Sequence, residues 1–257
     1  MKKLLLLLLL SVTPCIFGLI VEHKEFAALL NYLNAEDFHS KTLVLLDIDN
    51  TLAQPKNLLI GSDQFAYYLV TQKMKEGYTS DQSWQAVCPL YFAIQHAIDL
   101  EPVELTTPRI IKQLQDAGLT VIALTARSLE IRERTIDQLK DIAIDLSLSG
   151  LSPCEIISEI KQIYHYKKGI IFCAGHEKGK ILADILERAH YSPTKVIFID
   201  DKEKYLHVVQ QALAPTIEFV GIRYSYLDEK VAAFDAAVAE KELLEFLKNH
   251  PFEHAIA

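Results

Sequence analysis

Residues 41–52 read KTLVLLDIDNTL, an apolar run that ends in two carboxylates, Asp47 and Asp49. Four consecutive apolar residues without polar alternation are typical of a strand buried on both faces, as in a parallel sheet covered by helices. Ligands of such sheets gather beyond the carboxyl ends of the strands. Because residues two apart in extended backbone point to the same side, we expect Asp47 and Asp49 to converge on one small substrate.

Further short apolar runs recur at wide intervals, and each is short enough for a buried strand. They span residues 119–124, 169–173, 195–199 and 217–222. Segments of helical period lie between them, at residues 107–117, 129–142, 178–189 and 202–213, and a last helix is expected over 227–249. The alternation of strand and helix predicts an α/β fold, with a parallel sheet flanked by helices and right-handed crossovers.

The segment 53–104 is too long for a plain connection between a strand and a helix, and it is not rich enough in Gly or Ser to be a linker. Helical spacing of apolar residues over 62–75 predicts one helix. A second element is expected over 80–98, kinked or split by Pro89. We therefore expect a core domain of residues 19–52 and 105–257, with residues 53–104 inserted as a helical cap.

The first 18 residues read as an export signal, with two lysines, seven leucines and then Pro14 among small residues. Cleavage after Gly18 is expected. The mature chain is then periplasmic or secreted, with no stable membrane span. Because the apolar stretch continues from Leu4 to Val21, an uncleaved N-terminal membrane anchor is the alternative.

The chain has 257 residues, half of them hydrophobic, and a formal net charge of −8. Without the first 18 residues, which hold two lysines and no acid, the charge becomes −10. This acidity argues against nucleic acid as a partner. The cysteine spacing indicates no metal site; Cys173 is expected to be a buried thiol, and Cys88 with Cys154 is the candidate disulfide in an oxidising compartment.

Three later motifs place further polar groups at the ends of predicted elements. They are VIALTAR at residues 121–127, KGKIL at residues 178–182 and VIFIDD at residues 196–201. The first ends a strand in Thr125 and Arg127, the second begins a helix with Lys178, and the third ends a strand in Asp200 and Asp201. The ends of parallel strands and the start of a helix that follows a strand lie at the same edge of a sheet, which predicts a single site with Asp47.

These motifs, in this order, resemble the signature motifs of the haloacid dehalogenase-like phosphatases, the HAD superfamily. Asp47-Ile48-Asp49-Asn50-Thr51 is similar to the first motif, Thr125 to the second, Lys178 to the third and Asp200-Asp201 to the fourth. The resemblance covers residues 42–222, although the insertion matches only in position. It implies a Rossmann-like core with a small helical cap. The export signal, the compact insertion and Gly221-Ile222-Arg223-Tyr224 further resemble a poorly characterised exported group from intracellular bacteria.

The resemblance implies a Mg²⁺-dependent hydrolase acting on a phosphomonoester, either a small molecule or one borne on a protein. Asp47 would attack phosphorus to give an aspartyl-phosphate, and Asp49 would serve as general acid and base. Thr125 would donate a hydrogen bond to a phosphoryl oxygen, and Lys178 would neutralise charge in the transition state. Lys180 is the rival for the role of Lys178.

Crowded carboxylates that must also admit a phosphate need a counter-ion, and Mg²⁺ prefers oxygen ligands. The metal site implied by the resemblance comprises Asp47, Asp49, Asp200 and Asp201. Asp49 would contribute its backbone carbonyl, so that its side chain stays free for acid–base chemistry. Asp201 would orient either Lys178 or a metal-bound water.

Several alternatives stay open at this point. Arg127 either contacts the substrate or makes an ion pair on the following helix. The aromatic residues of the insertion either stack on an aromatic leaving group or form the core of the cap. These residues are Tyr67, Tyr68, Trp84, Tyr91 and Phe92. A phosphotransferase would use the same catalytic residues, and a non-catalytic exported binding or scaffold protein would keep the fold without turnover.

Overall fold

The computed structural model describes residues 18–38, 41–158 and 163–250. The predicted export signal, residues 1–18, therefore lies outside the described residues except for Gly18. Within the described ranges, no helix combines the length and the apolar character that crossing a membrane requires.

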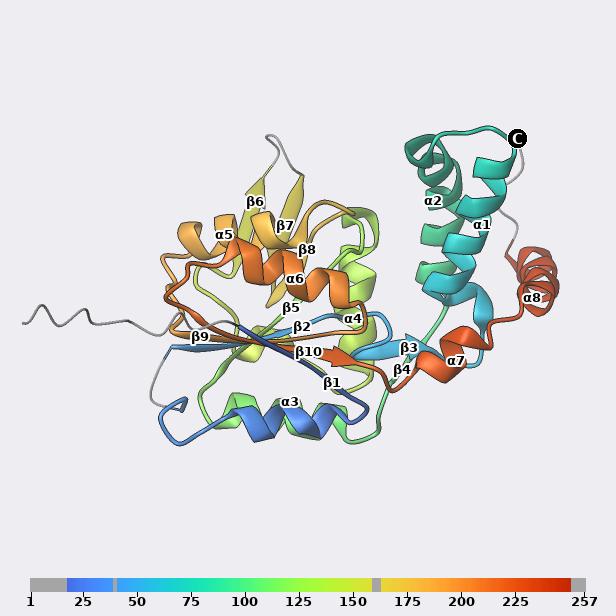
Figure 1. Ribbon diagram of the computed structural model, residues 1–257. Helices are drawn as coiled ribbons and strands as arrows, with labels where there is room; N and C mark the ends of the chain where they lie inside the picture. The colour runs from blue at the N-terminus through green and yellow to red at the C-terminus, as the bar shows by residue number, and fades with distance from the viewer. Residues whose placement is uncertain (1–17, 39–40, 159–162, 251–257) are drawn as a thin grey trace, which may run out of the picture.

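A mostly parallel eight-stranded sheet forms the centre of the protein, in the strand order β1-β10-β9-β2-β5-β8-β7-β6 (Figure 1). The parallel strands are β1 (Leu19–His23), β2 (Thr42–Leu46), β5 (Thr120–Thr125), β8 (Ile170–Phe172), β9 (Lys195–Asp200) and β10 (Glu218–Tyr224). Two antiparallel strands, β6 (Glu155–Ser158) and β7 (Tyr164–Lys167), extend one edge. The predicted α/β fold with a parallel sheet flanked by helices is confirmed, whereas β1, β6 and β7 were not predicted.

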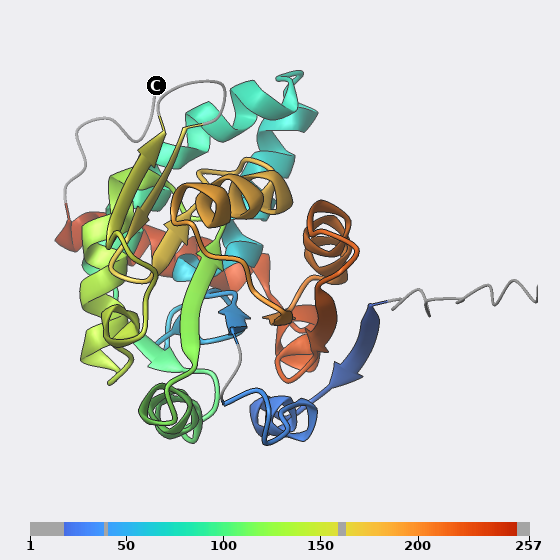
Figure 2. The same ribbon diagram turned by 90° about the vertical axis from the view of Figure 1, so that its left-hand side faces the viewer.

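Helices cover both faces of this sheet, and alternate residues of each strand pack on opposite layers. The helices are α3 (Thr107–Asp116), α4 (Arg132–Asp141), α5 (Lys178–Arg188) and α6 (Glu203–Ala212), with short 3₁₀ helices η1 (Phe26–Tyr32), η3 (Leu129–Ile131) and η4 (Leu146–Leu148). In β2, Val44 and Leu46 pack in the layer of α3 and α4, and Leu43 and Leu45 pack in the layer of α5 and α6. Figure 2 shows α3 below the sheet and the pair α5 and α6 above it.

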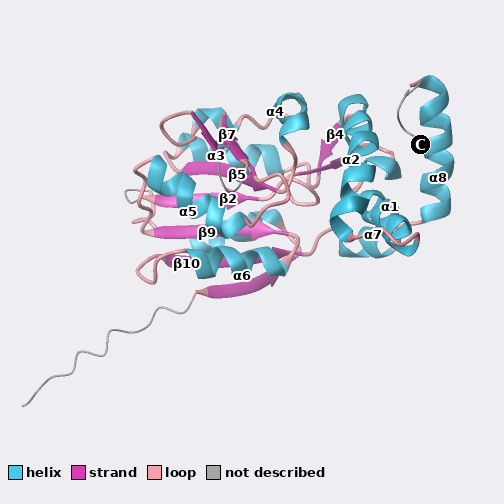
Figure 3. Cartoon of the chain, turned by 90° about the horizontal axis from the view of Figure 1, so that it is seen from above, coloured by secondary structure: helices cyan, strands magenta, loops and turns pink. Residues whose placement is uncertain are grey.

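The inserted segment forms a helical hairpin on a two-stranded stem. The stem consists of β3 (Ala53–Pro55) and β4 (Leu100–Pro102), which pair antiparallel. Between them lie η2 (Leu59–Gly61), α1 (Asp63–Lys75) and α2 (Ser80–Ala97). Helix α2 runs through Pro89 without splitting. Figure 3 shows the hairpin beyond the carboxyl ends of the central strands, where ligands of parallel sheets are expected.

The C-terminal segment differs from the single helix predicted over 227–249. It forms α7 (Asp228–Ala232) and α8 (Ala236–Asn249), and the break falls where the side chain of Asp235 caps α8. Helix α8 lies beside the inserted hairpin, because the Glu242 carboxylate accepts hydrogen bonds from the backbone N–H groups of Leu59 (2.7 Å) and Ile60 (3.2 Å). A helix that we assigned to the core domain thus packs on the cap, and the domain boundaries stay a prediction.

The cysteines do not form the suggested disulfide. Cys88, Cys154 and Cys173 are all free thiols. Cys88 lies on α2 within the inserted hairpin, and Cys154 is exposed just before the sheet-edge strand β6, so the two belong to different parts of the fold. Cys173 is fully buried, as predicted.

Candidate active site

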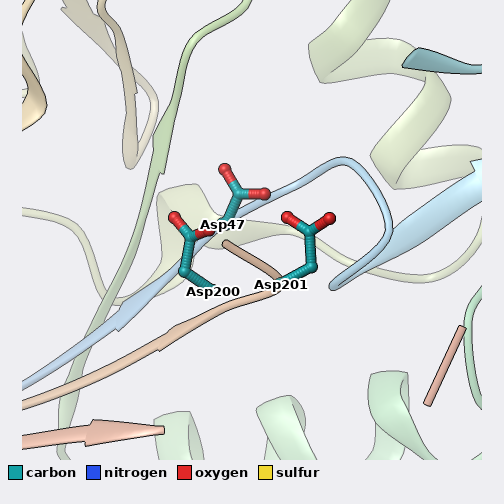
Figure 4. A group of neighbouring side chains, drawn as sticks. All are labelled: Asp47, Asp200 and Asp201. Atoms are coloured by element: carbon teal, nitrogen blue, oxygen red, sulfur yellow. The ribbon is translucent and has the colours of Figure 1, made fainter. Parts of the chain in front are cut away.

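The register of β2 and β9 brings Asp47 next to Asp200. Leu46 lies opposite Ile199, and the backbone N–H of Asp47 donates to the carbonyl oxygen of Ile199 at 2.9 Å. Two acids, one from each strand, therefore leave the sheet side by side. Figure 4 shows Asp47 at the end of β2 and Asp200 and Asp201 at the end of β9, with their carboxyl groups gathered in one place.

These three acids form a compact carboxylate cluster. One oxygen from each of Asp47, Asp200 and Asp201 lies within 4.8 Å of the others. Asp200 is fully buried and Asp47 is 6% exposed. The Oδ2 atom of Asp201 accepts a hydrogen bond from Asn50 (3.4 Å), but its buried Oδ1 atom has no hydrogen-bond partner among the described residues. An unpartnered buried carboxylate oxygen is costly, and a bound cation would satisfy it.

Lys178, the first residue of α5, is the cation inside this cluster. Its Nζ atom donates to Asp47 Oδ1 at 2.6 Å and to Asp200 Oδ2 at 2.8 Å, and the side chain is 1% exposed. Lys180 has a side chain that is 66% exposed and pairs with Glu177. The structure therefore brings Lys178, and not Lys180, to the acids.

The next residue, Gly179, explains why α5 can lie so close to α6. A Cβ atom at position 179 would meet the backbone oxygen of Val208 in α6 at 2.2 Å. Glycine thus permits the close approach of α5 and α6 that carries Lys178 to the ends of the strands.

The charges of this cluster do not balance without a cation in addition to Lys178. Three carboxylates face one ammonium group, which leaves an excess of two negative charges. Burial raises the pKa of Asp47 well above its ordinary value, and Asp200 and Asp201 raise it further although Lys178 opposes them. Burial likewise raises the pKa of Asp201 to about 7. A divalent cation with a preference for oxygen, such as Mg²⁺, fits both the charge and the donor set.

Asp49 points to a different partner. Its carboxylate accepts hydrogen bonds from Arg127, at 2.8 Å from Nη2 and 3.0 Å from Nε. Burial would raise the pKa of Asp49, but the guanidinium of Arg127 outweighs it and the pKa lies below its usual value. The Asp49 side chain is thus paired with Arg127 and is not one of the three acids of the cluster. That it stays off the metal remains a prediction.

Arg127 itself is buried and fully engaged. Besides the ion pair with Asp49, its Nη1 atom donates to Thr135 (3.0 Å) and Gln138 (3.1 Å) of α4. The sequence left open whether Arg127 contacts the substrate or makes an ion pair on the following helix. Its contacts with that helix are hydrogen bonds, and its ion pair is with Asp49. A role in substrate binding stays a prediction.

Thr125 ends β5 and is 1% exposed. Its Oγ1 atom accepts a hydrogen bond from the backbone N–H of Arg127 at 3.1 Å. Since that bond uses a lone pair of the oxygen, the hydroxyl hydrogen stays available for donation.

Sequence reasoning missed several supporting contacts. The Thr51 hydroxyl accepts a hydrogen bond from the backbone N–H of Asp201 at 3.2 Å, and the backbone N–H of Lys202 donates to Asp200 Oδ1 at 2.8 Å. Asn50 has a φ of 61°, a left-handed conformation that asparagine tolerates better than most residues. The Asn50-Thr51 pair directly after the two acids was a local signal of this tight turn.

Mg²⁺ is expected to stabilise the protein more at high pH. The pKa of Asp201 lies near 7 in the folded protein against an ordinary 3.8, so the folded form without metal loses stability as pH rises between these values. At about pH 8 Asp201 is ionised, and a bound cation recovers the lost stability. At about pH 5 Asp201 is protonated, so the cation must first displace a proton. Thermal unfolding should show a rise in Tm of roughly a few degrees with millimolar Mg²⁺ at the higher pH, and a smaller rise at the lower pH. Asp201→Asn should reduce both shifts, and an unchanged wild-type Tm at both pH values would contradict the expected metal site.

The fold and the site define an α/β protein with an acidic, lysine-containing site at the carboxyl edge of a parallel sheet. The chain belongs to the family described as "Protein of unknown function (DUF2608)", whose model matches residues 22–250. Two relatives are each named "Putative outer membrane protein". The one from Chlamydia pneumoniae is 28% identical over 187 residues, covering 70% of this chain and 68% of the relative. The one from Chlamydia muridarum is 29% identical over 185 residues, covering 71% and 68%.

A solved structure of a haloacid dehalogenase-like family hydrolase from Streptococcus pneumoniae is also similar to this chain. The TM-score is 0.44 at 13% sequence identity, and the match covers 77% of this chain and 100% of that structure.

Proposed function

We propose that this protein is a Mg²⁺-dependent phosphomonoester hydrolase that works through an aspartyl-phosphate on Asp47. The observation that carries the proposal is the meeting of Asp47, Asp200 and Asp201 within 4.8 Å of one another, with Lys178 between two of them. Carboxylates that surround a lysine at the open end of a parallel sheet suit the transfer of a phosphoryl group.

In the first step, Asp47 is the nucleophile. Its Oδ1 atom is held by Lys178, while its Oδ2 atom accepts no hydrogen bond from the described residues and is available for in-line attack on phosphorus. The bond between phosphorus and the ester oxygen breaks, and Asp49 gives a proton to the departing oxygen. The products of this step are an alcohol and the aspartyl-phosphate.

In the second step, Asp49 acts as a base. It removes a proton from a water molecule that attacks phosphorus, and the acyl-phosphate bond breaks to release inorganic phosphate and the Asp47 carboxylate. Arg127 holds Asp49 in its ionised form, which suits this second step. The first step requires Asp49 to take up a proton, so substrate binding must weaken the contact with Arg127.

The remaining groups stabilise charge. The hydroxyl hydrogen of Thr125 and the ammonium of Lys178 are suited to phosphoryl oxygens in the transition state. Mg²⁺ held by Asp47, Asp200 and Asp201, with the backbone carbonyl of Asp49, would offset the repulsion between these acids and the phosphate dianion.

The experiment that tests the proposal is an assay of the purified protein on p-nitrophenyl phosphate and a broad panel of phosphomonoesters. Hydrolysis should require Mg²⁺ and should stop when EDTA is added. Absence of turnover on the whole panel would favour a scaffold protein. Transfer of phosphate to an added alcohol in preference to water would favour a phosphotransferase.

We also infer that the protein is exported. The basic, leucine-rich residues 1–18 support this, as do the names of the chlamydial relatives, which refer to the outer membrane. The first described strand begins at Leu19, directly after the expected cleavage site, so a mature chain would keep its whole sheet. N-terminal sequencing of the protein from its host would test the inference.

A further inference from the structure

Lys202 connects the candidate site to the inserted hairpin. It directly follows Asp201, and its backbone is hydrogen-bonded to Asp200. Its Nζ atom donates to Asp63 Oδ2 at 2.6 Å, at the first residue of α1, and lies 5.4 Å from the centre of the Tyr67 ring. Tyr67 therefore lies on the hairpin next to the side chain of the residue that directly follows the carboxylate cluster.

Charged groups of the candidate site affect the pKa of the Tyr67 hydroxyl. Burial raises its pKa, and the carboxylates of Asp63, Asp201 and Asp49 raise it further although Lys202 opposes them. Asp49 is the proposed proton donor to the leaving oxygen, so groups close to Asp49 on the hairpin side are placed to contact the leaving group.

Tyr67 and its neighbour Tyr68 have different surroundings. The rings of Tyr68 and Phe65 stack with their centres 6.3 Å apart, and the Tyr68 hydroxyl donates a hydrogen bond to Glu240 of α8. Tyr68 therefore belongs to the packing between the hairpin and α8. Tyr67 is 42% exposed and meets Trp84 of α2 edge to face, with ring centres 5.4 Å apart. Neither the Tyr67 hydroxyl nor the Trp84 indole N–H has a hydrogen-bond partner among the described residues. The two rings thus form an accessible aromatic surface beside the site.

The charged side chains near this surface are already paired. Lys202, the cation next to the Tyr67 ring, is matched by Asp63. A leaving group with a second charge would have to compete with this partly buried ion pair, which is costly. The surroundings therefore favour an uncharged group with a flat face that stacks on tyrosine and tryptophan.

We propose that Tyr67 and Trp84 bind the leaving group of the substrate, and that this leaving group is uncharged and aromatic. The inference rests on the proposed phosphomonoester hydrolase activity and adds the class of substrate to it. Tyr67 and Trp84 determine specificity and take no part in the bond-breaking steps.

A matched pair of substrates tests the inference. 2-Phenylethyl phosphate and 2-cyclohexylethyl phosphate both release a primary alcohol of similar acidity, and they differ in whether the six-membered ring is flat and aromatic or saturated and puckered. Because the saturated ring is the more hydrophobic one, a preference for the phenyl substrate indicates stacking and not simple apolar burial. The wild-type protein with Mg²⁺ should show a kcat/KM about 10-fold higher for the phenyl substrate, mainly through KM. Trp84→Leu and Tyr67→Leu should each move this ratio toward one.

Tyr78→Leu is the control, because Tyr78 is 46% exposed like Tyr67 but lies in the turn between α1 and α2. It should leave the ratio unchanged. Equal kcat/KM values for both substrates, or a ratio that survives both leucine variants, would overturn this inference while the hydrolase proposal stands. Absence of Mg²⁺-dependent hydrolysis of both substrates and of p-nitrophenyl phosphate would overturn the two proposals together.

Discussion

Replacing Asp47 by asparagine is expected to abolish phosphomonoester hydrolysis, with kcat falling by about 10⁴-fold or more. The amide has nearly the same shape as the carboxylate but cannot attack phosphorus. Its oxygen can still accept the hydrogen bond that Lys178 makes to Asp47 at 2.6 Å. The variant should therefore fold. Acid-quenched samples analysed by mass spectrometry should show phosphate on residue 47 of the wild-type protein and none on the variant.

Stability and activity should change in opposite directions at this position. Because burial and neighbouring carboxylates raise the pKa of Asp47, its ionised form is unfavourable in the protein without metal. Asp47→Asn removes one of three crowded charges, so its Tm in EDTA should equal or exceed that of the wild-type protein.

Asp37→Asn is the matched control for Asp47→Asn. Asp37 is 5% exposed and pairs with Lys195 at 3.0 Å, at the opposite end of the sheet. This variant loses a buried carboxylate but should retain kcat. If Asp47→Asn keeps more than roughly one hundredth of the wild-type kcat, an aspartyl-phosphate at this position is excluded.

Replacing Lys178 by methionine is expected to destabilise the protein without metal by about 3–5 kcal/mol and to remove its activity. The ammonium lies between Asp47 and Asp200 and 4.2 Å from the centre of the Tyr205 ring. Methionine fills most of the volume but leaves the buried acids without a counter-charge. Urea unfolding at about pH 8 should show the loss, and Mg²⁺ should restore part of it because the cation supplies positive charge at the same place.

Lys195→Met separates a general cost of losing a buried lysine from an effect at the site. Lys195 has a side chain that is 6% exposed, and its Nζ atom lies 3.0 Å from Asp37 and 3.2 Å from Glu218. This variant should be destabilised in a similar way but should gain nothing extra from Mg²⁺, and its folded fraction should remain active. A Lys178→Met protein as stable as the wild type in EDTA would mean that the acids are not charged as proposed.

The core strands and their terminal polar residues could be predicted because the signals are local. A run such as Leu43 to Leu46 has no polar alternation, so it is buried on both faces wherever the chain places it. Parallel pairing then brings the carboxyl ends to one edge, which is why Asp47, Asp200 and Lys178 were expected together and are found together. The functional roles of these residues stay predictions.

Contacts between distant segments could not be predicted in the same way. Nothing near Arg127 in the sequence indicates that its guanidinium pairs with Asp49, and nothing near Lys202 indicates Asp63. The different contacts of the adjacent Tyr67 and Tyr68 depend on Trp84 of α2 and Glu240 of α8, which come later in the chain. The periodicity of a helix shows which residues share a face but not which surface that face meets.

The amino-acid sequence by itself determined the α/β architecture and the edge of the sheet that carries the acids. The apolar pattern of each segment shows that it is a buried strand, and the position of the acids shows at which end of the strand they lie. The tertiary structure alone decided that the single ammonium of Lys178 is shared between Asp47 and Asp200, that Arg127 pairs with Asp49 and that α8 packs on the inserted hairpin. Each of these is a choice among partners far apart in the chain. These pairings depend on how the layers of helices and sheet pack, because a buried charged side chain pairs with the opposite charge that this packing places next to it.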